Sequence, residues 1–116
     1  MKKLLIALII LIITASSCKT VYSTTSIEPK KSFVLGDNEH GAFEVTIKNI
    51  SNDDLDLCQM PNGGTKQLIQ VLNSSKSATV KIEKNTALYI DNKSDNKASV
   101  ELNLKSNTNL SMGYKN

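Results

Sequence analysis

The strongest constraint on the fold is a period-two alternation of apolar and polar residues that recurs in short runs along the chain. In the segment 42–50, the apolar residues Phe43, Val45 and Ile47 alternate with polar ones. Side chains of a β-strand point to opposite faces in turn, so this pattern predicts a half-buried strand. The alternating runs together predict a core of Phe43, Val45, Ile47, Leu55, Leu57, Val80, Ile82, Leu88, Ile90, Val100, Leu102 and Leu104.

Short runs of this kind, separated by polar turns, indicate an all-β chain. We expect a small antiparallel β-sandwich, immunoglobulin-like or barrel-like, with about seven or eight short strands. The turns are too short for parallel pairing, which needs connections of about a dozen residues or more. No repeat of fixed period is evident beyond this strand rhythm.

One segment, residues 66–72, has an ambiguous pattern. Its apolar residues have the spacing of a helical stripe: Leu68, Ile69, Val71 and Leu72. An isolated helix of this length would be marginal in water, and a turn-like Asn-Ser-Ser-Lys sequence follows. We therefore expect a strand here.

The N-terminus has the layout of a secretory signal peptide. Lys2 and Lys3 precede an apolar run at 4–13, which small residues follow at 15–17. A ten-residue helix reaches only about 15 Å, whereas the hydrocarbon layer is about 30 Å thick. We therefore expect residues 1–17 to be a signal peptide that is removed, not a permanent membrane span.

The sequence Ala15-Ser16-Ser17-Cys18 resembles the lipobox of bacterial lipoprotein precursors. The resemblance covers the first eighteen residues and implies cleavage between Ser17 and Cys18, with acylation of Cys18, for example by palmitate. Lys19, in place of an aspartate, resembles the sorting signal for the outer membrane. Ordinary signal-peptide cleavage would cut the same bond and leave Cys18 as a free thiol that could bridge to Cys58.

Cleavage at this bond would leave 99 residues, enough for one domain. We expect a lipidated N-terminus and tether at residues 18–31 and a β-sandwich domain at residues 32–116. The polar, β-branched segment 19–31 suits a tether or a loose first strand, and we expect a tether that leads into a strand. All fourteen basic residues are lysines, and twelve of them remain after cleavage against eleven acidic residues, which gives a formal charge of +1. Nucleic-acid binding is not expected, because the mature chain has no arginine and only one basic pair, Lys30-Lys31.

Few residues could carry catalysis. His40 is the only histidine, it lies in an expected loop, and no serine has a nucleophile-elbow sequence such as G-x-S-x-G. The sequence also has neither an H-E-x-x-H motif nor a phosphate-binding glycine loop. We expect a protein that is not an enzyme and has no cofactor.

A soft-metal site formed by His40, Cys58 and Met60 is the alternative interpretation, because imidazole, thiolate and thioether are ligands that copper accepts. Such a site resembles that of blue-copper proteins but has one histidine where two are normal. Packing of Cys58 and Met60 in the sheet is therefore the preferred interpretation.

Two other patterns have ordinary explanations. Asp53, Asp54 and Asp56 could suggest calcium but lack the glycine and the terminal glutamate of an EF-hand loop, so we expect an acidic turn without an ion. Four sequences match the glycosylation sequon, as expected by chance in an asparagine-rich chain, and they begin at Asn49, Asn73, Asn92 and Asn109.

The sequence therefore predicts a non-enzymatic lipoprotein of the cell envelope, anchored in the outer membrane by lipid on Cys18. Its domain would bind or scaffold an envelope protein or a glycan. Acylation stabilises membrane attachment by about 0.8 kcal/mol for each buried methylene group.

Overall fold

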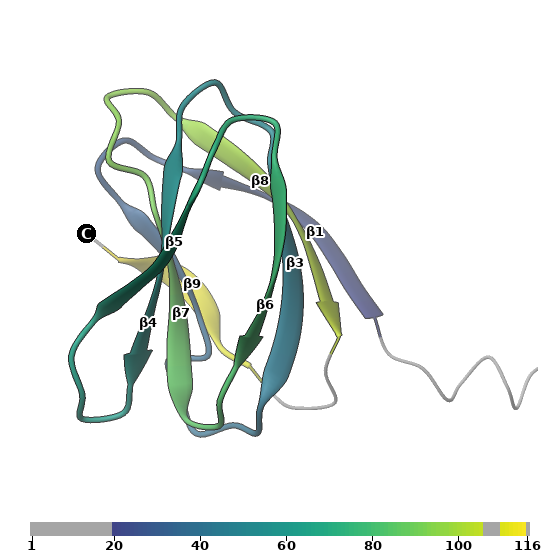
Figure 1. Cartoon of the computed structure of the whole chain (residues 1–116), viewed down its shortest axis with the longest axis vertical. Helices are drawn as coiled ribbons and strands as arrows, with labels where there is room; N and C mark the ends of the chain where they lie inside the picture. Colours follow the sequence, from purple (N-terminus) through teal and green to yellow (C-terminus); the bar gives the residue numbers. More distant parts are fainter. Residues whose placement is uncertain (1–19, 106–109, 116) are drawn as a thin grey trace, which may run out of the picture.

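The computed structural model describes residues 20–105 and 110–115, which form nine β-strands and no helix. Two antiparallel sheets pack face to face, as Figure 1 shows. The predicted all-β sandwich is therefore confirmed. The strands are β1 (Thr20–Ile27), β2 (Ser32–Leu35), β3 (Phe43–Asn49), β4 (Leu55–Pro61), β5 (Gln67–Leu72), β6 (Ser77–Ile82), β7 (Thr86–Asp91), β8 (Ala98–Lys105) and β9 (Met112–Lys115).

The strand order is β1-β8-β3-β6 in the four-stranded sheet and β5-β4-β7-β2-β9 in the five-stranded sheet. Every paired strand is antiparallel to its neighbour, as the short turns predicted. Within the described part of the chain, no helix is long and apolar enough to cross a membrane.

Strand β1 lies where a tether was expected. All eight of its residues pair with β8, from Thr20 opposite Lys105 to Ile27 opposite Ala98. Its inner face carries Thr25 and Ile27, which are both buried. The sheet therefore begins at Thr20, within the segment that was expected to lead from a tether into a strand. The polar side chains of this segment gave only a weak strand signal, because its backbone pairing with β8 does not require apolar side chains.

All twelve residues of the predicted core are buried in one cluster between the sheets. Five further buried residues belong to it: Ile27, Phe33, Leu35, Leu72 and Ala98. Strand β7 departs from the expected pattern, because Ala87 and Tyr89 on its outer face are buried as well as Leu88 and Ile90. It is the central strand of the five-stranded sheet, and a second apolar cluster covers its outer face.

The two halves of the domain repeat each other, although no fixed period was evident in the sequence. Strand β7 begins 43 residues after β3, at position 86 against 43, and β8 begins 43 residues after β4, at 98 against 55. The equivalent strands also exchange partners, since β3 pairs with β8 and β4 pairs with β7. Each half therefore contributes to both sheets.

The repeat is clearest in two loops, one after β3 and one after β7. Asn49-Ile-Ser51 and Asn92-Lys-Ser94 are 43 residues apart, and both asparagines are almost fully buried. In each loop the asparagine Oδ1 accepts hydrogen bonds from the backbone N–H and the hydroxyl of the serine two residues on. The repeat was hard to see in the sequence because it lies mainly in the backbone and in these polar turns.

Candidate ligand-binding groove

The outer face of the four-stranded sheet is hollowed into a groove of about 470 Å³. Residues from all four strands line it, and most of their side chains carry a hydroxyl or amide group. The lining residues are Tyr22, Ser23, Thr24, Thr46, Lys48, Ser77, Glu101, Leu102 and Asn103.

The register of the sheet places four of its polar side chains in one row across the strands. Tyr22 on β1 is opposite Asn103 on β8, which is opposite Thr46 on β3, and Thr46 is opposite Thr79 on β6. Asn103 Nδ2 donates a hydrogen bond to Tyr22 Oη at 3.1 Å, and the two threonine hydroxyls are 2.8 Å apart. These contacts set the positions of the hydroxyl groups along the row.

Two features of this row are unusual for a solvated sheet face. The Tyr22 side chain is 74% exposed, the largest exposure among the large hydrophobic residues of the described chain. The Oδ1 atom of Asn103 is buried and has no hydrogen-bond partner. Buried acceptors are nearly always paired in native proteins, so an unpaired one requires an explanation.

The outer face of the five-stranded sheet differs from the groove in that apolar side chains are buried at its centre. Val34, Cys58, Ala87 and Tyr89 form a small buried cluster there, with Met60 packed against it. The Lys66 ammonium group lies 4.7 Å from the centre of the Tyr89 ring and 2.6 Å from Asp91 Oδ2. The apolar stem of a lysine can cover apolar surface while its charged end stays paired.

Cys58 and Met60 thus pack in this second cluster, as the preferred interpretation had it. The Cys58 thiol donates to Asp91 Oδ2 at 3.7 Å. Burial, together with the charge of Asp91, raises the pKa of this thiol above its usual value of 9.0. A thiol that stays protonated is a poor metal ligand and a poor nucleophile.

Cys58 should therefore react slowly in the folded protein. With Cys18→Ser as background, we expect a disulfide reagent at pH 8 to modify Cys58 at least about tenfold more slowly in the native state than in urea. As pH rises above 9.0, the thiol ionises in the unfolded chain but stays protonated in the folded one, so stability should fall with pH until the folded pKa is passed. A Cys58→Ala variant should lose this part of the pH dependence, and equal reaction rates in the two states would contradict the assignment.

His40 has different surroundings from Cys58 and Met60. Its Nδ1 lies 2.5 Å from the Gly41 carbonyl oxygen, and its Nε2 lies 2.9 Å from that of Thr86. The ring packs against Phe43 and over Gly36, whose φ of +79° and missing Cβ leave room for it. Both nitrogens are thus occupied by backbone oxygens, and no cluster of three His, Cys, Asp or Glu residues suited to a metal occurs in residues 20–105 and 110–115.

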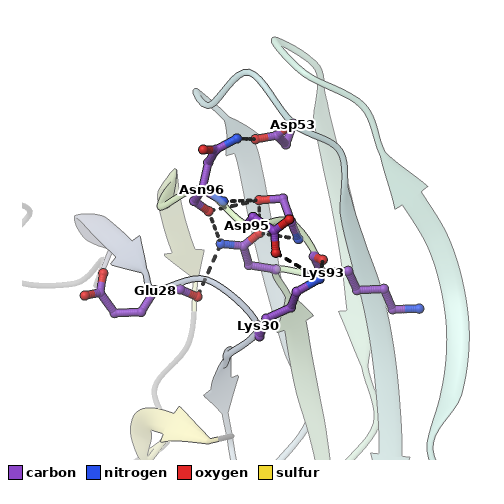
Figure 2. A network of polar contacts seen from close by, with 8 residues as sticks. Glu28, Lys30, Asp53, Lys93, Asp95 and Asn96 are labelled. Atoms are coloured by element: carbon purple, nitrogen blue, oxygen red, sulfur yellow. Dashed lines mark hydrogen bonds and ion pairs between the residues drawn. The ribbon is translucent and has the colours of Figure 1, made fainter.

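The acidic turn is held by protein groups. Asp54 Oδ1 accepts the backbone N–H of Ser74, and Asp56 pairs with Lys93 at 2.6 Å. Asp53 Oδ2 accepts a hydrogen bond from Asn96 at 3.3 Å, which joins the two repeated loops (Figure 2).

The close-up of this network also shows Lys30 beside Asp95 and the 92–97 loop (Figure 2). Four turns meet at this end of the sandwich, at the top of Figure 1. The sequons at Asn49 and Asn92 are structural elements of these turns, because each buried Nδ2 donates to backbone carbonyls.

The remaining predicted site residues, Ser17 and Cys18, lie outside the described residues, as does the sequon at Asn109. The groove residues were not predicted, because hydroxyl side chains on alternate strand positions look like any solvated face. Only the register brings Tyr22 next to Asn103, from 81 residues away in the sequence.

The sequence matches no protein-family model, and no curated protein matches it significantly. Solved structures share its fold. An uncharacterised protein with a double-stranded β-helix domain from Klebsiella pneumoniae aligns with a TM-score of 0.57 and 12% identity, over 84% of this chain and 76% of that one. The capsular polysaccharide assembling protein CapF from Staphylococcus aureus aligns with a TM-score of 0.56 and 13% identity, over 78% of this chain.

This chain spans only 24% of the CapF protein. A mitogen derived from Yersinia pseudotuberculosis aligns with a TM-score of 0.49 and 16% identity, over 76% of this chain and 86% of that one. At these identities the likeness to the Klebsiella pneumoniae and CapF structures is one of fold alone. In this domain each half contributes to both sheets.

Proposed function

We propose that this chain is a non-enzymatic binding protein of the bacterial cell envelope, anchored by lipid on Cys18, whose binding surface is the groove of the four-stranded sheet. The observation that carries the proposal is the groove itself: about 470 Å³, lined from four strands, with an exposed tyrosine at one side. This volume lies in the range of small-molecule sites, about 300 to 1,000 Å³.

The lining supports binding rather than catalysis. None of the nine groove residues is a histidine or a cysteine, so the groove holds neither of these common proton-transfer and nucleophilic groups. Its two charged residues, Lys48 and Glu101, are paired opposite each other in the register. Hydroxyl and amide groups on a rigid sheet can position a ligand, and Glu101, the one carboxylate of the lining, faces Lys48.

The anchor is supported by the sequence of the first eighteen residues. The mass of the intact mature protein tests it: we expect a chain that begins at Cys18 and carries added acyl mass. A chain without that mass would remove the anchor, and a loss of two hydrogens would instead indicate a bridge between Cys18 and Cys58.

The binding role is tested by cross-linking in intact envelopes, followed by purification of the anchored protein. We expect an envelope protein or glycan to be enriched with the native chain and lost with a groove variant such as Thr46→Lys, which points a long charged side chain from the middle of the row. Gln70→Lys is the control, because Gln70 is exposed on β5 of the other sheet and does not line the groove. Equal recovery from both variants and the native chain would contradict the groove as the binding surface.

A further inference from the structure

We infer that the groove binds a neutral sugar ring, which stacks on Tyr22 and hydrogen-bonds to the pair formed by Tyr22 and Asn103. This inference rests on the proposed function and names the ligand class for the same surface. Three properties of the groove lead to it: its unused hydrogen-bonding groups, its exposed aromatic ring and its charge.

The first property is that Tyr22 and Asn103 have hydrogen-bonding groups without a partner among the described residues. Asn103 Nδ2 donates to Tyr22 Oη, so the phenol oxygen acts as an acceptor and its own proton is left for another partner. Asn103 Oδ1 is an acceptor without a donor. The pair therefore offers the acceptor Oδ1 together with at least one donor, and exchanging the amide oxygen and nitrogen of Asn103 still leaves both a donor and an acceptor.

A sugar hydroxyl matches this pair because it donates and accepts at once. A carboxylate or phosphate group supplies acceptors and would leave Oδ1 unpaired, whereas an ammonium group supplies only donors. Tyr22 is 74% exposed, so its hydroxyl and ring are open to a ligand at the edge of the groove.

The second property is the exposed ring of Tyr22 at the edge of the groove. An aromatic side chain with one polar end presents an apolar face to a ligand and a hydroxyl to its rim. The apolar C–H face of a sugar ring can pack on such a surface while its hydroxyls reach Thr24 and Asn103 in the lining. Thr46 and Ser77 lie two and three strands from β1, within reach of the further rings of a short oligosaccharide.

The third property is the charge of the lining. Lys48 and Glu101 are its only ionisable groups apart from the tyrosine, and they have opposite signs at facing positions of β3 and β8. Their fields largely cancel, so the groove has no net charge that would select an anion or a cation. A neutral polar ligand is favoured.

The test is a titration of the mature Cys18→Ser protein, followed by amide chemical shifts. The probes are N-acetylglucosamine trimer and maltotriose as neutral sugars, with acetate and inorganic sulfate as anions without hydrogen-bond donors, all in the millimolar range. We expect a neutral sugar to shift amides of β1, β8 and β3 in a saturable manner, and the anions to leave them unchanged. Tyr22→Ala and Asn103→Ala should each weaken binding about tenfold or more.

Tyr114→Ala is the matched control, because Tyr114 is also exposed but lies on β9 of the other sheet. It should bind sugar as the native chain does, and the dispersed spectrum of each variant shows that it is folded. No saturable shift with any neutral sugar, shifts with anions alone, or equal losses in Tyr22→Ala and Tyr114→Ala would overturn the inference. If cross-linking then still captured a protein partner in a groove-dependent manner, the proposed function would stand and only the ligand class would fall.

Discussion

Replacing Asn49 by alanine should lower the free energy of unfolding by about 3 kcal/mol, because it leaves several buried backbone groups without partners. Asn49 is fully buried, and its Nδ2 donates to the carbonyl oxygens of Asp53 at 2.8 Å and Leu72 at 3.0 Å. Its Oδ1 accepts the backbone N–H of Ser51 at 3.0 Å. Urea unfolding followed by circular dichroism measures the effect.

Asn52→Ala is the control for this substitution, since Asn52 lies in the same loop but is exposed. It should change stability by no more than about 0.5 kcal/mol. The equivalent variant Asn92→Ala should also be strongly destabilised, because Asn92 Nδ2 donates to Ile27 O at 3.0 Å and so ties β1 to the loop. If Asn49→Ala were no less stable than Asn52→Ala, the anchoring role of the buried asparagine would be wrong.

Replacing Leu57 by alanine should destabilise the domain by about 2 to 5 kcal/mol, through lost burial and the cavity left behind. Leu57 is fully buried in the main core, and it lies on β4, which pairs with β5 and with the central strand β7. A sandwich of this size has few layers that could move into the space. The same urea experiment measures the loss.

Leu68→Ala is the matched control, on the neighbouring strand β5. The Leu68 side chain is 59% exposed, so the same deletion of atoms should cost well under 1 kcal/mol. Similar losses in the two variants would contradict the assignment of the core to the space between the sheets.

The strands and the core could be predicted because alternation reports directly on which side of a strand is buried. Strand β5 shows a feature that alternation does not predict, namely a β-bulge. A β-bulge at Leu57 and Cys58 shifts its register, so that Cys58 is opposite Leu68 whereas Leu57 is opposite Gln70. The extra residue, Ile69, packs against the core, and this shift gave β5 its helix-like apolar spacing.

Strand β1 and the outer face of β7 were harder to predict for opposite reasons. Strand β1 has few apolar residues and is held by its backbone bonds to β8, which leave little signal in side-chain type. Tyr89 is buried on the outer face by a cover that includes Lys66, from a segment distant in the sequence. Local sequence patterns show neither the backbone pairing of a polar strand nor the burial of a side chain by a distant segment.

The groove is a third case, because it depends on which strands become neighbours. Tyr22, Asn103 and Thr46 come from three separate segments, and each is an ordinary polar strand residue by itself. Only the strand order β1-β8-β3 brings them into one row. A sequence pattern could therefore indicate the groove only after the topology was known.

The start of β1 at Thr20 also limits the distance between Cys18 and the β-sandwich. Thr20 follows Cys18 by two residues, and Tyr22 follows it by four. Four extended residues span at most about 14 Å. If Cys18 is acylated as proposed, Tyr22 at the edge of the groove stays within that reach of the lipid surface, so the groove would sample mainly molecules concentrated near this layer. Tethering of this kind raises the effective concentration of ligands in the layer and leaves more distant ones out of reach.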